Sequence, residues 1–136
     1  MEKDMKEVAM EFRFVQNSMF IKDIYINNAG PFDFLVSSDT TNTTLDKAMA
    51  NKLELVLEKV GMGIGLGGQV PIFKTSANLQ VGKLEIKNFT FLVTDLSQIS
   101  TKFGLNIAGV IANDILRNFK AVIDYGNNQL KLRKST

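Results

Sequence analysis

Apolar and polar residues alternate along most of the chain with the two-residue period of a β-strand. Residues 11–15 (EFRFV), 19–26 (MFIKDIYI) and 32–36 (FDFLV) follow this pattern. The segment 27–31 (NNAGP) is rich in turn-forming Asn, Gly and Pro, and it separates the second run from the third. We therefore predict a mainly β protein. Further strands are expected at 55–60, at 70–74, on both sides of Gly82 within 77–96, at 107–112, and in a closing hairpin made of 120–125 and 129–133.

One segment has a helical period instead. Apolar residues recur every four positions from Leu45 to Leu53, which predicts an amphipathic helix over 45–54. A hydroxyl residue before this helix, Thr43 or Thr44, is a suitable N-cap.

Two shorter segments have weaker helical signals. Residues 97–104 (SQISTKFG) read as a short helix or a turn, and residues 113–119 (NDILRNF) as a short helix. Asp114 most simply caps the second of these. Together with the segment 45–54, this predicts a mainly β chain with one or two short helices.

A glycine-rich run lies between two predicted strands and allows two interpretations. It contains a G-x-G-x-x-G pattern, but a strand follows it rather than the helix that a dinucleotide site requires, so we reject a nucleotide site. Glycine tolerates positive φ and exposes the backbone, which suits a mobile hairpin tip. This tip is either an ordinary flexible loop or a lid with apolar side chains that closes over a ligand. Its residues are Gly61, Met62, Gly63, Ile64, Gly65, Leu66, Gly67 and Gly68.

Composition excludes several kinds of chemistry. The chain of 136 residues contains no Cys and no His, which removes thiol nucleophiles, Ser-His-Asp triads and the usual zinc sites. Any acid–base catalysis would depend on carboxylates or Lys. We expect no cofactor and no metal. Sixteen basic residues against 14 acidic ones leave a net charge of only +2, which does not favour nucleic acid as a partner.

The sequence leaves the cellular compartment open. No stretch approaches the roughly 18 apolar residues of a membrane span, and the segment 1–10 (MEKDMKEVAM) lacks the apolar core of a signal peptide. A periplasmic or other extracytoplasmic location would follow only if a leader had been removed.

The order of these elements resembles one lobe of the retropepsin-like aspartic peptidases, in particular the bacterial single-lobe group. Three stretches carry the resemblance: INNAGPFDFLV (26–36), TNTTLDKAMANKLEL (41–55) and IAGVIANDILRNFKAVIDYGNNQLKL (107–132). They span nearly all of residues 11–133. The resemblance implies a closed antiparallel β barrel, formed by a single domain over 1–136 with its core at about 11–133.

The defining motif of that family is degenerate here. The family has two apolar residues followed by Asp-Thr/Ser-Gly-Ala/Ser-Ser, and often Asn next. When Asn42 is aligned with that Asn, Ser37 takes the position of the catalytic Asp and Ser38 that of Thr/Ser. Asp39 falls on the glycine, and two threonines take the small positions. The surroundings of the motif are therefore kept while its carboxylate is missing.

The second half of the expected site also departs from the family. The resemblance assigns to it a loop that contains Gly109, Ala112, Asn113 and Asp114. Ala112 stands where the family has a glycine after two apolar residues.

The resemblance implies a loss of activity. Aspartic peptidases share one proton between two carboxylates, one from each lobe, so a single-lobe chain has to dimerise to form the pair. Serine at position 37 removes both carboxylates of a homodimer, and no His is present to activate its hydroxyl. We therefore expect a catalytically inactive homologue that binds an extended peptide or unfolded polypeptide in the groove of a homodimer. Its subunits would meet at this loop and through the terminal segments 1–15 and 129–136.

The sequence leaves two other functions open. In a rebuilt loop, Asp39 of each subunit could supply the two carboxylates in place of residue 37. The protein would then be an active aspartic endopeptidase. Against this, the family has glycine at that position because the two loops pack tightly, and Asp39 is more simply a turn carboxylate bonded to its own backbone. The third possibility is a structural or interaction module, or an engineered inactive variant.

Overall fold

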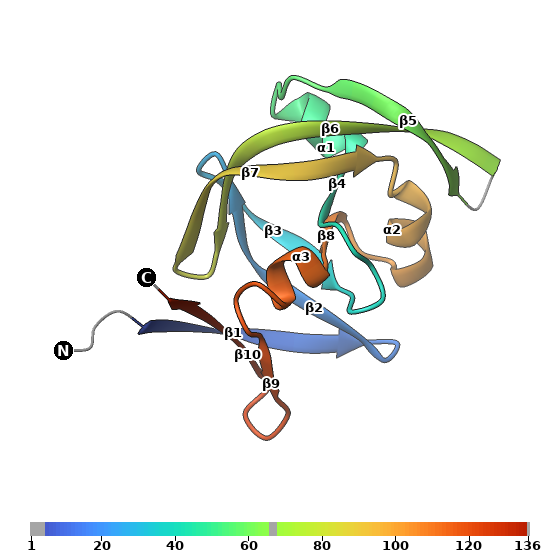
Figure 1. Cartoon of the computed structure of the whole chain (residues 1–136). Helices are drawn as coiled ribbons and strands as arrows, with labels where there is room; N and C mark the ends of the chain where they lie inside the picture. The colour runs from blue at the N-terminus through green and yellow to red at the C-terminus, as the bar shows by residue number, and fades with distance from the viewer. Residues whose placement is uncertain (1–4, 66–67, 136) are drawn as a thin grey trace.

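The alternating pattern folds into a mainly β structure with three short helices, which a computed structural model describes over residues 5–65 and 68–135 (Figure 1). The expectation of one or two helices was therefore too low. The strands are β1 (Met5–Val15), β2 (Ser18–Ile26), β3 (Ala29–Val36), β4 (Thr44–Asp46), β5 (Glu58–Gly65), β6 (Gly68–Val81), β7 (Leu84–Thr94), β8 (Ile107–Ile111), β9 (Val122–Asp124) and β10 (Gln129–Ser135). The helices are α1 (Lys47–Lys52), α2 (Ser97–Phe103) and α3 (Asn113–Leu116).

The strands form one mixed sheet that curls back on itself. Their order is β5-β6-β7-β4-β8-β3-β2-β1-β10-β9, and an additional ladder joins β6 to β2. The six strands from β6 to β2 therefore follow one another in an uneven ring. Two of its ladders, β3–β8 and β4–β7, are parallel. The other ladders are antiparallel, and the two parallel ones arise because long connections between these strands bring them back in the same direction.

The interior of this ring is filled by aromatic and branched apolar side chains. Phe34 at the end of β3, Leu45 in β4 and Phe91 in β7 are fully buried. Each such side chain contributes roughly 1.5–3 kcal/mol through its removal from water. Gly109 in β8 is also required, since an added Cβ would meet the ring of Phe34 and lie 2.5 Å from the carbonyl oxygen of Thr44. This packing holds the ends of β3 and β8 at a fixed separation.

The segment after the polar loop differs from its prediction. Thr44 begins the short strand β4 and the helix starts only at Lys47, so the helix expected over 45–54 is shorter. Its N-cap is Asp46, whose carboxylate accepts the N–H of Met49 at 3.3 Å, rather than Thr43 or Thr44. The same carboxylate accepts the N–H of Leu96 at 2.9 Å and so ties α1 to the end of β7.

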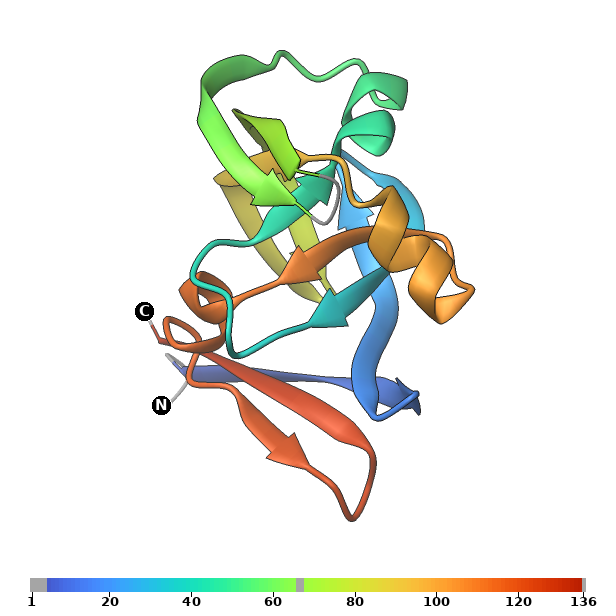
Figure 2. The same cartoon turned by 90° about the vertical axis from the view of Figure 1, so that its right-hand side faces the viewer.

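The two ends of the chain pair with each other. β1 and β10 form an antiparallel ladder from Met5–Ser135 to Glu11–Gln129. Figure 1 shows both termini on one side of the molecule, with the end of the β5–β6 hairpin and the β1–β2 turn on the opposite side. Figure 2 views the molecule from that opposite side. None of the helices described is long and apolar enough to cross a membrane.

Candidate functional site

The polar loop at 37–43 lies beside the start of α3. β3 and β8 run parallel, and Val36 is opposite Ile111 in their ladder. Because the carboxyl ends of parallel neighbours reach the same edge of a sheet, the residues that follow the two strands meet there. The structure thus brings the first-half positions near Ser37 together with the second-half positions after Ile111.

Hydrogen bonds join this loop to the start of α3. The N–H of Ser37 donates to the carbonyl of Ile111 at 2.9 Å, which extends the ladder by one residue. The backbone N–H of Asn113 donates to Thr40 at 3.0 Å, and its side-chain amide donates to the carbonyl of Ser38 at 2.6 Å. The loop is therefore held at several points and its backbone is preorganised.

A second set of bonds centres on Asp114. Its carboxylate accepts both the N–H of Thr43 at 2.9 Å and the Thr43 hydroxyl at 2.6 Å. The fully buried Thr43 hydroxyl in turn accepts the N–H of Ala112 at 3.0 Å. Asp114 also donates its backbone N–H to the carbonyl of Thr41 at 3.1 Å. The two bonds to the carboxylate are charge-assisted, and together with the two neutral ones they hold the loop against α3.

The role expected for Asp114 as a helix cap is therefore wrong. Ala112 occupies the N-cap position of α3 and makes no side-chain capping bond. Asp114 lies inside the first turn, and Thr43 satisfies its carboxylate from across the loop. A sequence argument misses this pair because the two residues are 71 positions apart. Thr43 stands inside a run of polar residues between Asn42 and Thr44, so the local pattern does not single it out.

Ser37, which the sequence resemblance led us to expect at the position of the catalytic Asp, carries a hydroxyl group. The Oγ of Ser37 lies 3.1 Å from the Oγ1 of Thr40, and the two share a hydrogen bond. Asp39 is the nearest acid along the chain, and its side chain is exposed. The hydroxyl groups of Ser37 and Thr40 can donate hydrogen bonds to a peptide backbone and accept them from it, but neither hydroxyl is a base at neutral pH.

The glycine-rich run differs from the loop that we predicted. Gly61, Gly63 and Gly65 belong to β5, which pairs with β6 up to the pair Gly65–Gly68. Leu66 and Gly67, the expected tip, lie outside the described residues. The strand expected at 55–60 begins only at Glu58.

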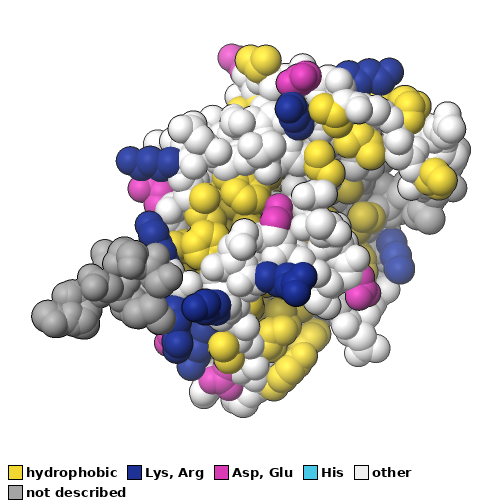
Figure 3. Space-filling view, in the orientation of Figure 1, with side chains coloured by type: hydrophobic (Ala, Val, Ile, Leu, Met, Phe, Trp, Pro, Cys, Tyr) yellow, Lys and Arg dark blue, Asp and Glu magenta, His cyan; other side chains and the backbone are white. Residues whose placement is uncertain are grey.

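This hairpin has one apolar face and one open edge. Met62 and Ile64 alternate with glycines in the regular part of the β5–β6 ladder and so point to the same side of β5, where both are exposed. Figure 3 shows hydrophobic side chains gathered over this upper part of the molecule. β5 is the last strand of the sheet, so its outer edge has no strand partner within the described residues. Such an edge can pair with an extended chain.

Comparison with known proteins agrees with this architecture. The family model described as aspartyl protease matches residues 23–129. A retropepsin-like aspartic protease from Rickettsia conorii superposes with a TM-score of 0.67 at 21% identity, over 93% of this chain and 98% of that one. Among curated protein sequences, none matches the chain.

Two further solved structures have the same fold. The retroviral protease-like domain of Ddi1 from Leishmania major gives a TM-score of 0.57 at 19% identity, over 92% of this chain and 89% of that one. The EIAV protease in complex with the inhibitor HBY-793 gives 0.56 at 21% identity, over 79% and 90%. Identities this low establish the fold alone.

Proposed function

Because the chain belongs to the aspartyl protease family, we propose that it is a retropepsin-like protein that binds peptides as a homodimer and has lost peptidase activity. The proposed unit is one domain over 1–136, with its core at about 11–133. The observation that carries this proposal is the hydroxyl pair of Ser37 and Thr40 at the end of β3. The loop is built and held in place, but the carboxylate that would share a proton with its partner is replaced by a hydroxyl.

We expect no measurable cleavage of denatured casein between acidic and neutral pH. Serine at position 37 leaves no base for the attacking water, and general acid–base catalysis is worth about 10²–10⁴ in rate. The measurement is release of labelled fragments over this pH range. Cleavage that disappears in Asp39→Asn and with a statine-type inhibitor would refute the proposal, and it would establish the relocated carboxylate pair of an active endopeptidase.

An exposed apolar patch supports the homodimer. Phe14 is 48% exposed and Tyr125 is 65% exposed, and their rings stack with centroids 6.1 Å apart. Ile123 in the edge strand β9 is also exposed. Figure 3 shows hydrophobic side chains gathered at the lower side of the molecule, over β1 and β9. Apolar clusters of this kind on a folded chain are typical of interaction sites.

The exposed aromatic patch of Phe14 and Tyr125 changes where we expect the subunits to meet. The terminal segments expected to join two subunits already pair with each other inside one chain, through the β1–β10 ladder. We therefore place the contact at the end of β1 that holds Phe14 and adjoins the β1–β2 turn. That turn lies on the same side of the molecule as the hairpin end (Figure 1).

The protein is expected to be a dimer at tens of micromolar and a monomer after Phe14→Glu together with Tyr125→Glu. In a dimer, the two new carboxylates of each subunit would be buried next to the two of the other subunit. Buried charges of the same sign without counter-ions destabilise an interface. Sedimentation velocity measures the change. Val56→Glu, at a site 87% exposed and outside this patch, is the control that keeps the dimer. A wild-type chain that sediments as a monomer would contradict the proposed assembly.

The β5–β6 hairpin supports peptide binding. An extended peptide can add to the free edge of β5 through backbone bonds, while its apolar side chains contact Met62 and Ile64. This mode needs no catalytic residue.

Replacing Ile64 with Asp is expected to weaken binding of an extended apolar peptide by about tenfold, since one well-placed apolar contact is worth about 1–2 kcal/mol. Ile64 is 92% exposed, so the folded state should be unaffected. Fluorescence anisotropy with a labelled unfolded polypeptide reports the affinity, and Val56→Asp is the matched control. Absence of binding to any such ligand would favour a structural module.

A further inference from the structure

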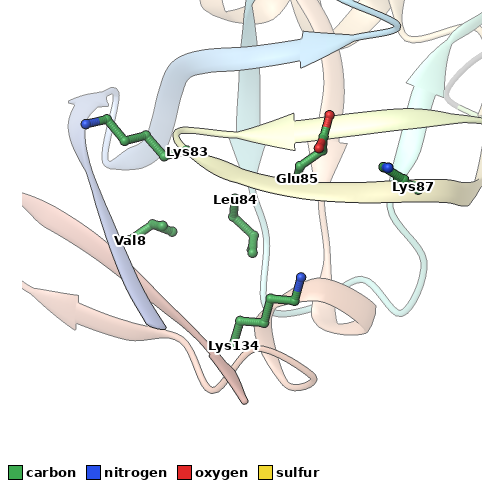
Figure 4. A pocket seen from close by; sticks show the side chains of 6 residues that line it. All are labelled: Val8, Lys83, Leu84, Glu85, Lys87 and Lys134. Atoms are coloured by element: carbon green, nitrogen blue, oxygen red, sulfur yellow. The ribbon is translucent and has the colours of Figure 1, made fainter. Parts of the chain in front are cut away.

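A hollow near the chain termini lies away from the loop and the β5–β6 hairpin. It has a volume of about 420 Å³ and opens between β1, β10 and the turn from β6 to β7 (Figure 4). Val8 and the buried Leu84 give it an apolar floor. Charged side chains form its rim, namely those of Lys83, Glu85, Lys87 and Lys134.

The rim has an excess of positive charge. It carries three ammonium groups against the single carboxylate of Glu85. The ion pairs found between described residues use Arg13, Lys74, Lys131 and Arg133 instead. The rim lysines are therefore not neutralised by described carboxylates within ion-pair distance, and they favour an anionic occupant.

An open backbone edge adjoins this hollow. β10 pairs with β1 as far as Glu11, whereas β2 pairs with β1 only from Phe12 onward. The other edge of the first half of β1 consequently has no strand partner in the described part of the chain. Val8, which lines the hollow, lies in the middle of this half.

The hydrogen-bond pattern identifies which groups point to that edge. The N–H of Arg133, opposite Glu7, donates to Phe119 at 2.6 Å and so points away from β1. In an antiparallel ladder, the two residues of such a pair both direct their N–H and C=O away from each other. The backbone groups of Glu7, and two residues later those of Ala9, therefore face the open edge.

We propose that this edge and the hollow form a second binding site, which takes an extended acidic peptide segment. The segment adds as a strand to β1 through the backbone of Glu7 and Ala9. Its alternate carboxylates lie on the same face of the added strand as Val8 and reach the rim lysines around the hollow. The side chain of Glu7 does not oppose this, because it points to the other face of β1 and pairs with Arg133 at 3.5 Å.

This inference stands independently of the proposed function. It uses none of the residues of the polar loop, the β5–β6 hairpin or the aromatic patch. Figure 1 shows the termini, beside which the hollow lies, on the opposite side of the molecule from the hairpin end.

The test measures binding of a labelled peptide of alternating Glu and Val to the full chain by fluorescence anisotropy, at low and at physiological salt. The triple variant K83E/K87E/K134E should weaken binding by about tenfold or more, because several charge contacts reverse their sign. The control K22E/K52E/K102E makes the same change in net charge elsewhere and should stay within about threefold of the wild type.

The backbone part of the proposal needs its own variant. Ala9→Pro removes the N–H that faces the open edge, and proline is tolerated at an edge of this kind. Loss of one backbone bond should weaken binding by about tenfold. A peptide N-methylated at alternate residues tests the same bonds from the ligand side, without any change in the protein.

Three results would overturn the proposal. The first is equal affinity for the matching Lys-Val peptide, or no effect of the triple reversal. The second is displacement by inorganic phosphate with no effect of Ala9→Pro or N-methylation, which would show an anion site only. The third is dissociation of the dimer by the peptide, which would show that the edge of β1 is a subunit contact.

Discussion

Replacing Thr43 with Val is expected to destabilise the fold by about 3 kcal/mol, since an isosteric change removes a hydroxyl that makes two buried hydrogen bonds. The Thr43 hydroxyl donates to Asp114 at 2.6 Å and accepts the N–H of Ala112 at 3.0 Å. After the change, the N–H of the fully buried Ala112 has no partner. Urea unfolding measures the loss, which should appear as a lower midpoint with an unchanged slope.

Thr43→Ser separates the hydroxyl from the methyl group. Serine keeps both hydrogen bonds and loses one buried methyl, so a loss of only about 1 kcal/mol is expected. Equal destabilisation by Val and Ser would mean that packing of the methyl, rather than the bonds to Asp114, stabilises the loop.

The strands could be predicted because their signal is local. The alternation in 19–26 and 32–36 appears as β2 and β3, and the Asn-rich turn between them has positive φ at Asn27 and Asn28. The closing hairpin and the turn at Gly82, whose φ is +60°, also follow their prediction. In each case a short stretch contains both the strand pattern and the residues that reverse the chain.

The predictions from sequence fail where contacts between residues far apart in the chain determine the structure. The Thr43–Asp114 pair and the parallel ladders β3–β8 and β4–β7 join parts of the chain that no local pattern links. The glycines of 61–65 predict a mobile hairpin tip because glycine accepts positive φ and exposes the backbone. They form β5 because β6 supplies its hydrogen-bond partners. Glycine suits position 63 within this strand because an added Cβ would meet the side chain of Ile72.

The same distinction between local and long-range signals applies to the candidate site. A resemblance between sequences aligned Ser37 with a catalytic position, and the structure places this residue at the end of β3, bonded to Ile111. The chemistry of a two-fold site depends on a second subunit, whose position follows from surface packing rather than from local pattern.

Restoring the family motif should create peptidase activity. Ser37→Asp, Ser38→Thr and Asp39→Gly together rebuild Asp-Thr-Gly directly after β3, on a backbone that Ile111 and Asn113 already hold. We expect a gain of about 10²-fold over the inactive chain, at the lower end of what acid–base catalysis supplies, because the groove residues have not been adjusted. The activity should have an acidic optimum, since one carboxylate of the pair has to stay protonated. Cleavage of a broad peptide library over a range of pH measures it.

Ser37→Asp alone is the informative control. With Asp39 retained, a homodimer would bring four carboxylates into a small space, and their repulsion would oppose either the assembly or the shared proton. The single variant should therefore remain close to inactive. The resemblance predicts a glycine at the position of the fully buried Ala112, so Ala112→Gly is the next change if its methyl keeps the two loops apart. A triple variant that folds, dimerises and cleaves nothing, with or without Ala112→Gly, would remove the main support for descent from a working peptidase. The groove would then be a binding surface in its own right, because the loop would lack catalytic geometry as well as a carboxylate.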